Sequence, residues 1–309
     1  MEEKKLYPMR LLGTERGYME TLIGGGWLGG TTLDELMELY MDRVTGEDVF
    51  RWYGLLFPVQ MRLVRTDDGL PLMVHPGDEL AQSRFDALGK EKFWYIKKAG
   101  KGAKLLIGLK EASDAGELWN ALKGDRDADA LLNAVIPHPG EAYAIPAGTL
   151  HAARGELEII EVAQSSELDF ALPEFLEEAL DFIDYKACRP APAKGDTLLQ
   201  LPQFSVSRIR LDTPLQIRGA ITDAYTLFYA LDGSFLATTD NGESTEVPRD
   251  GILLMPAEAG DYRLEAKDSA CTLLAVTTER REESDDITYH GDPDSDEDKV
   301  PRGKDYRVS

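Results

Sequence analysis

The chain has 309 residues, of which 43% are hydrophobic, and this is enough apolar material for two domains of ordinary size. Its 56 Asp and Glu outnumber its 34 Lys and Arg, which gives a formal net charge of -22 at pH 7. This charge argues against binding to nucleic acid or to an anionic membrane surface, because both need clustered basic side chains. An anionic ligand would need a local basic cluster for the same reason.

The sequence is typical of a cytoplasmic protein. The first residues lack the apolar core of a signal peptide, and no apolar run approaches the roughly 20 residues that a membrane helix needs. Cys188 and Cys271 show no CxxC spacing, so we expect two isolated, reduced thiols.

The first elements are a helix and a series of short strands. Thr32 and Glu35 have capping-box spacing, which predicts an amphipathic helix near residues 33–41. Two more helices are predicted, one at 78–88 closed by Gly89 and one near 114–123 with Ser113 as its N-cap. The strands between and around them are predicted at 57–65, 70–75, 92–98, 103–109, 142–146 and 156–164.

The second half begins with a predicted helix at 169–184, entered after Pro173, and a Pro-rich linker at 191–198. A second set of β segments fills residues 199–278. Asp-Gly at 232–233, Asn-Gly at 241–242 and Asp-Gly at 250–251 predict hairpins within it. Residues 279–309 are charged and nearly free of aliphatic side chains, so we expect a disordered acidic tail, with a partner-binding acidic segment as the alternative.

One motif carries a specific chemical signal. In GEAYAIPAGTLH, Gly140, Pro146, Gly148 and His151 have the spacing of the second cupin motif. A strand that runs up to Pro146 and turns at the glycine would aim His151 into a barrel, where an imidazole can bind a divalent metal. A lone histidine there would more often be a satisfied core residue, but His75 on an earlier strand favours a metal site.

The chain resembles the type I mannose-6-phosphate isomerase family, in its short bacterial form, in four segments whose order and separations also agree. They are FPVQMRLVRTDDGLPLMVHPGDELA, LGKEKFWYI, PGEAYAIPAGTLHA and LEIIEVAQSSE. The resemblance extends over roughly residues 5–278. It implies a mainly β fold with α inserts, built from two cupin-like jelly-roll barrels in tandem. The expected domains are an N-terminal cupin at 1–190, carrying the metal and substrate pocket, and a C-terminal cupin at 199–278.

The resemblance also implies a zinc site, and this chain departs from it. The family binds one zinc ion with a Gln and a His from one strand, a Glu from a second and a His from the cupin motif. His75 and His151 match the two histidines, but Met73 stands at the Gln position and Lys92 at the Glu position. Glu91 lies one residue too early and should point to the opposite face of its strand. Glu79 could substitute as a ligand only if it did not open a helix.

Other positions of the family pocket are partly kept. Arg62 replaces a lysine that lines the family's pocket, Lys90 matches another lysine, and Glu161 matches the pocket glutamate. Ala171 stands where the family has an arginine associated with catalysis. The resemblance therefore assigns catalysis to Glu161, Lys90 and Arg62, and it assigns substrate binding to these three and Lys92.

Three functions remain open at this point. The first is interconversion of mannose 6-phosphate and fructose 6-phosphate by zinc-assisted proton transfer between C1 and C2. The second is a catalytically impaired relative that binds a sugar phosphate without zinc, because the Lys92 ammonium supplies positive charge where the ion would lie. The third is a structural cupin with a vestigial pocket. We expect a monomer or a weak homodimer with a small-molecule ligand.

Overall fold

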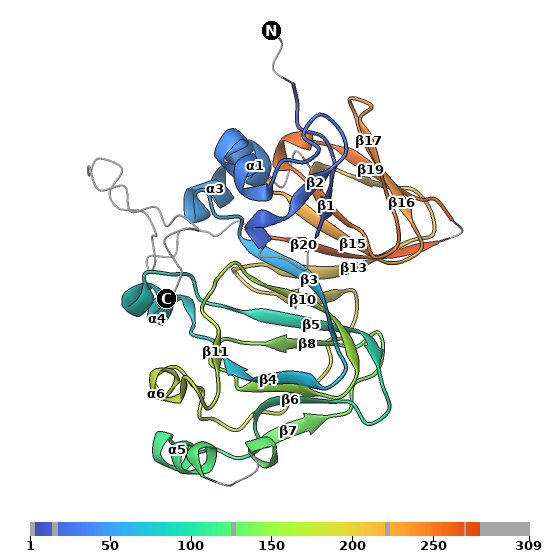
Figure 1. The fold of residues 1–309 in the computed structure, drawn as a ribbon. Coiled ribbons are helices and arrows are strands. Elements are labelled where there is room, and N and C mark those ends of the chain that lie inside the picture. Colours follow the sequence, from blue (N-terminus) through green and yellow to red (C-terminus); the bar gives the residue numbers. More distant parts are fainter. Residues whose placement is uncertain (1–3, 14–17, 125–127, 220–222, 269, 279–309) are drawn as a thin grey trace, which may run out of the picture. The chain divides into compact units, whose positions relative to one another are not determined.

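The computed structural model describes residues 4–13, 18–124, 128–219, 223–268 and 270–278. The described residues form two compact units (Figure 1). One unit consists of Gln60–Ala193, and the other combines the residues up to Val59 with those from Lys194 on. Each unit contains two antiparallel sheets, so the chain is mainly β, as predicted.

The unit Gln60–Ala193 contains a four-stranded and a five-stranded sheet. The first has the order β3 (Val59–Thr66), β10 (Leu157–Gln164), β5 (Lys92–Ala99) and β8 (Ala142–Ile145). The second has the order β11 (Phe170–Ala171), β4 (Gly69–Val74), β9 (His151–Arg154), β6 (Lys104–Leu109) and β7 (Leu132–Val135).

Apolar side chains from both sheets of this unit share one core. Trp94 and Ile159 of the first sheet lie in the same buried cluster as Leu105 and Ala153 of the second. The outer face of the second sheet packs a separate cluster against the helices α4 (Asp78–Phe85), α5 (Ala115–Lys123) and α6 (Leu176–Ala179). Side chains on alternate positions of the facing strands therefore point into the space between the two sheets.

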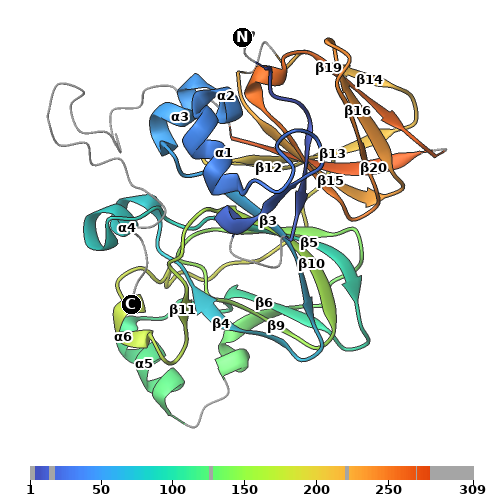
Figure 2. The same ribbon diagram turned by 45° about the horizontal axis from the view of Figure 1, so that its top comes forward.

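The other unit is built on a seven-stranded and a four-stranded sheet (Figure 2). The larger has the order β12 (Thr197–Gln200), β13 (Ser205–Leu211), β20 (Cys271–Thr277), β15 (Thr226–Asp232), β18 (Ile252–Met255), β1 (Met9–Leu12) and β2 (Leu22–Gly24). The smaller has the order β14 (Leu215–Ile217), β19 (Tyr262–Ala266), β16 (Phe235–Thr239) and β17 (Ser244–Val247). The helices α1 (Leu33–Tyr40), α2 (Asp42–Thr45) and α3 (Glu47–Tyr53) belong to this unit.

The strand β1 belongs to a different unit from the one that the sequence predicted for the first residues. The sequence assigned residues 1–59 to the same domain as the metal and substrate pocket. In the structure β1 pairs antiparallel with β18, with Met9 opposite Leu254, so it belongs to a sheet of C-terminal strands. Backbone hydrogen bonds thus join an early strand to strands from the C-terminal half in one unit. The expected tail, 279–309, lies outside the described residues.

Several helix predictions hold, with corrected ends. The capping box is confirmed, since Thr32 and Glu35 exchange hydrogen bonds at the start of α1. The N-cap of α5 is Asp114 rather than Ser113, because its carboxylate accepts the Glu117 amide hydrogen. Gly89 does not end α4, which stops at Phe85 with left-handed Asp86 as its C-cap.

The predicted helix at 169–184 and two predicted hairpins are wrong. Residues 170–171 pair with β4 as β11, and only the short α6 follows at 176–179. Asn241-Gly242 connects the paired strands β16 and β17, as predicted. The Asp-Gly turns at 232–233 and 250–251 instead connect strands of different sheets, because β15 and β18 pair with each other.

Candidate functional site

The two sheets of the unit Gln60–Ala193 bring the predicted site residues together. On the first sheet, Glu161 of β10 lies directly opposite Trp94 of β5, and Lys92 lies two residues before Trp94 on the same face. On the second sheet, Met73 of β4 lies opposite His151 of β9. Strand alternation and register therefore direct these side chains into the space between the sheets.

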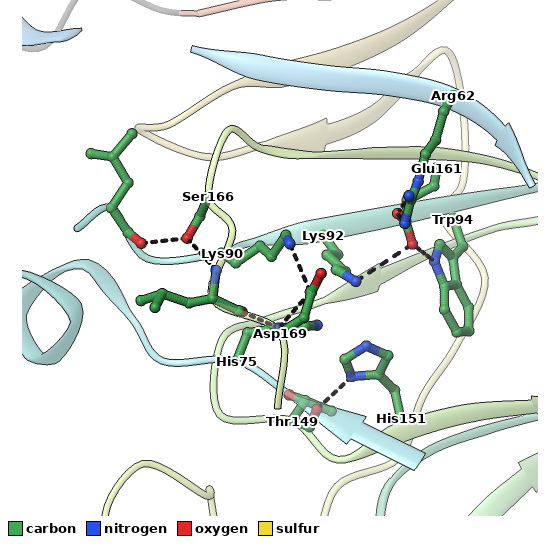
Figure 3. A network of polar contacts seen from close by, with 12 residues as sticks. Arg62, His75, Lys90, Lys92, Trp94, Thr149, His151, Glu161, Ser166 and Asp169 are labelled. Atoms are coloured by element: carbon green, nitrogen blue, oxygen red, sulfur yellow. Dashed lines mark hydrogen bonds and ion pairs between the residues drawn. The ribbon is translucent and has the colours of Figure 1, made fainter. Parts of the chain in front are cut away.

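Glu161 is the centre of the polar contacts on the first sheet (Figure 3). Its Oε1 accepts hydrogen bonds from Arg62 Nε at 2.9 Å and from an Arg62 terminal nitrogen at 2.7 Å. Its Oε2 accepts one from Trp94 Nε1 at 2.8 Å and lies 3.6 Å from Lys92 Nζ. Glu161 is only 4% exposed, so three donors hold this carboxylate in place away from water.

The two histidines are buried with one ring nitrogen of each held by the backbone. His75 Nδ1 lies 2.8 Å from the Leu168 carbonyl oxygen, and His151 Nδ1 lies 2.8 Å from that of Thr149. A carbonyl only accepts, so each Nδ1 carries the hydrogen and each Nε2 carries a lone pair. Both Nε2 atoms are buried without a hydrogen-bond partner, and the ring centroids are 5.0 Å apart.

The turn between β8 and β9 ties the two histidines together. Gly148 has φ +80° and its amide donates to the His75 carbonyl oxygen at 2.7 Å. A Cβ at Gly148 would come within 2.8 Å of a backbone oxygen, so the glycine of the motif is required here. The predicted turn therefore serves to place His151 beside His75.

Lys90 and Asp169 form a second ion pair next to His75. Lys90 Nζ donates to Asp169 Oδ1 at 2.7 Å, and the same oxygen lies 3.4 Å from His75 Nδ1. Lys90 is 3% exposed, whereas the Asp169 side chain is 45% exposed. Ser166 supports the loop that carries Asp169, since its hydroxyl donates to the Leu88 carbonyl oxygen.

Burial and the Lys92 ammonium set the charge states of the site. Burial and Lys92 lower the pKa of His151 to about 3, and burial, Lys92, His151 and Lys90 lower that of His75 well below its usual value. Burial alone would raise the pKa of Glu161, but Lys92, Arg62 and the hydrogen bonds from Trp94 and Arg62 lower it to about 2. At pH 7 both imidazoles are therefore neutral and Glu161 is ionised.

A cavity of about 60 Å³ lies among these side chains, lined by Met73, Lys92, His151, Glu161 and Asp169 together with Arg62, Trp94 and three apolar residues. Water occupies roughly 30 Å³ per molecule in the liquid, so the cavity holds about two water-sized groups. Pockets that enclose a whole small-molecule ligand are commonly about 300 Å³ or larger. Only one end of a hexose derivative would fit inside.

The two substitute ligands considered from the sequence do not reach this cavity. Glu91 precedes β5, and its Oε2 accepts the Ala147 amide hydrogen at 3.1 Å. Burial raises the pKa of Glu91 to about 7. Glu79 lies in the first turn of α4. Neither residue lines the cavity.

The substituted positions Met73 and Ala171 are neighbours in the second sheet. Ala171 of β11 lies opposite Met73, which in turn lies opposite His151, so the three residues form one row across three strands. Directly opposed residues of antiparallel strands share a face. The changes at 73 and 171 therefore affect the same side of the same sheet.

Sequence reasoning missed Trp94 and Asp169. Trp94 could have been found from its position two residues after Lys92, which places it on the same face of β5. Asp169 had no comparable signal, because it lies in a loop that the sequence assigned to a helix. Its contacts with Lys90 and His75 depend on the pairing of β11 with β4.

The described part of the chain contains no group of three or more His, Cys, Asp or Glu side chains arranged to hold a metal ion. None of its helices is long and apolar enough to cross a membrane. Zinc normally has three or four protein ligands among Cys, His, Asp and Glu. The two Nε2 lone pairs suit a metal, but a methionine and a buried lysine stand at the remaining positions, so the residues present do not fit zinc.

Comparisons with known proteins show partial similarity in sequence and more extensive similarity in fold. No family model matches the sequence. The mannose-6-phosphate isomerase of Streptococcus mutans is 28% identical over 155 residues, which cover 50% of this chain and 47% of that protein. The mannose-6-phosphate isomerase ManA of Bacillus subtilis is 29% identical over 157 residues, which cover 50% and 48%. The chain spans about half the length of the curated relatives it matches.

The similarity in fold is more extensive. The solved structure of the mannose 6-phosphate isomerase from Bacillus subtilis matches with a TM-score of 0.68 and 19% identity, over 88% of this chain and 99% of that one. At this identity the match shows the fold alone. Together with the sequence relatives, it confirms that the chain resembles the mannose-6-phosphate isomerase family.

Proposed function

We propose that this chain is a mannose-6-phosphate isomerase-like protein, built on two cupin barrels, that binds a phosphorylated sugar without zinc. The observation that carries the proposal is the position of Lys92. Its ammonium is 3% exposed, lies 3.6 Å from Glu161 and lowers the pKa of both histidines. A fixed positive charge beside two neutral imidazoles attracts an anionic ligand and repels a divalent cation.

The polar groups can bind the sugar end of a sugar phosphate inside the cavity and its phosphate at the cavity edge. The small cavity admits the end of the sugar near His151 and Lys92. The Arg62 side chain is 46% exposed while it contacts Glu161, so this cation at the edge of the cavity is open to a phosphate from solvent. Lys90 holds Asp169 and thereby positions the loop beside the cavity.

Isomerase activity is the second candidate, and the sequence relatives favour it. The reaction needs a group that takes and returns a proton, and such a group works best with a pKa near the working pH. In the described cavity the pKa of Glu161 is about 2 and that of His151 about 3. The carboxyl with a pKa of about 7, Glu91, does not line the cavity. The geometry therefore supports ligand binding better than proton transfer.

Three measurements on the same purified chain test this proposal. Metal content is measured by mass spectrometry after incubation with zinc, binding of mannose 6-phosphate by calorimetry, and its conversion to fructose 6-phosphate by a coupled assay. We expect binding without retained zinc and without conversion. Stoichiometric zinc that is lost in the His75→Ala, His151→Ala double variant, together with conversion, would replace the proposal by the isomerase. Absence of sugar phosphate binding would leave a structural cupin.

A further inference from the structure

The charges around the cavity do not balance without a ligand. Arg62 and Glu161 form one pair, and Lys90 and Asp169 form another. Among the described residues Lys92 forms an ion pair with Glu161 alone, and Glu161 already accepts hydrogen bonds from Arg62 and Trp94. Three positive side chains thus face two negative ones. The described side chains leave one positive charge in excess, and it belongs to a buried ammonium.

The His151 side chain lines the cavity with a nitrogen that can only accept a hydrogen bond. His151 is 2% exposed, its Nδ1 hydrogen is donated to Thr149, and its Nε2 has no partner. A buried acceptor left without a donor destabilises the folded chain. A carboxylate or an ionised phosphate oxygen has no hydrogen to donate. A ligand that satisfies both Lys92 and His151 therefore needs a negative group and a hydroxyl next to each other.

Charge separates a carboxylate from a phosphate at this position. A phosphate brings a charge of about −1.5 to −2 at pH 7, whereas the excess charge of the site is one. A carboxylate brings a single negative charge, and an adjacent hydroxyl supplies the hydrogen for His151 Nε2.

We infer that the cavity receives the C1 carboxylate and C2 hydroxyl of a sugar acid, an aldonate, rather than the aldehyde end of an aldose. The inference rests on the proposed zinc-free binding at this same site. The carboxylate accepts from Lys92 and the hydroxyl donates to His151 Nε2. A phosphate at the far end of the same ligand remains outside the cavity, on the side of the half-exposed Arg62.

Calorimetry with two matched pairs of ligands tests the inference on the full chain. 6-Phosphogluconate and glucitol 6-phosphate differ only at C1, and we expect the first to bind at least about tenfold more tightly, which is the loss expected for one charge-assisted hydrogen bond. Glycolate and acetate differ only by the hydroxyl, and we expect glycolate to bind more tightly.

Variants on one strand identify the groups responsible. Lys92→Met should abolish the preference for 6-phosphogluconate, whereas Lys98→Met on the same strand should keep it, because the Lys98 side chain is 53% exposed and pairs with Glu156. His151→Phe should abolish the preference for glycolate. If a variant does not fold, the ligand pairs on the unchanged chain still decide.

The outcomes separate the inference from the proposed function. Equal binding of 6-phosphogluconate, glucitol 6-phosphate and mannose 6-phosphate would overturn the inference and leave zinc-free sugar phosphate binding intact. Tight binding of 6-phosphogluconate without binding of mannose 6-phosphate would support the inference and exclude the aldose phosphate as ligand. If none of the three binds, both the inference and the proposed function are wrong.

Discussion

Replacement of Glu161 by glutamine should destabilise the protein by about 3 kcal/mol at pH 7. The pKa of Glu161 is about 2 in the folded chain against an ordinary 4.5, and this difference corresponds to about 3 kcal/mol of stability. The loss of one partner from a buried ion pair, typically about 3–5 kcal/mol, gives a similar magnitude. The substitution keeps the shape of the side chain but leaves Arg62 and Lys92 without their carboxylate.

The pH dependence of this effect follows from the direction of the pKa change. The stabilisation by Glu161 is fully present above pH 4.5 and is lost as the pH falls toward about 2, because the folded state must then bind the proton against its ion pairs. Urea unfolding of the unchanged chain and of Glu161→Gln at pH 7 and pH 3 measures the difference. Glu158→Gln on the same strand is the control, since Glu158 pairs at 3.6 Å with Lys97 near the surface. A difference below about 1 kcal/mol at pH 7, or one that does not shrink at pH 3, would refute the assigned role of Glu161.

Three further predictions concern stability away from the cavity. Glu91→Gln should stabilise the protein by up to about 2 kcal/mol at pH 8 but not at pH 4, because burial raises the pKa of Glu91 to about 7. Protonated Glu91 stabilises the folded chain, and this stabilisation is lost as the pH rises from 4.5 through 7. Urea unfolding of both chains at the two pH values measures the difference. Gly46→Ala should lower the free energy of unfolding about 2 kcal/mol more than Gly30→Ala, since both glycines have positive φ but only at Gly46 would a Cβ collide with the Asp223 carbonyl oxygen. Asn133→Ala should lower the free energy of unfolding by about 1–3 kcal/mol, because the Asn133 amide nitrogen contacts four backbone carbonyl oxygens. Urea unfolding measures this loss, and an equal loss for Asn120→Ala at an exposed position would contradict the reasoning.

The strands were predictable because their local pattern decides them. The predicted segments 92–98, 103–109 and 156–164 each agree with an observed strand to within one residue at either end. The helix at 169–184 failed because its amphipathic pattern is local, whereas the pairing of Phe170 with Val74 is made across the sheet. The Asp-Gly turns failed for a related reason: their chemistry fixes a tight turn but not which sheet the next strand joins.

The members of the site were predictable, but their contacts were not. Lys92, Glu161, His75 and His151 lie together as the resemblance implied. The sequence could not show that Trp94 donates to Glu161, because that contact requires the register between β5 and β10. It also could not show the size of the cavity. The monomer or weak homodimer and the cytoplasmic location stay predictions.

The identity of residue 92 bears on how the buried Glu161 carboxylate of this pocket is compensated. In the ligand set that the resemblance implies, this position holds a glutamate next to a zinc ion. Lysine in place of glutamate raises the charge of the position by two units, which equals the charge of the absent ion. The Glu161 carboxylate consequently remains ionised in a buried position, with Lys92, Arg62 and Trp94 as partners. A smaller or neutral residue at position 92 would have left a buried carboxylate with less compensation. The lysine therefore compensates the buried Glu161 carboxylate at the position where the resemblance implies an ion.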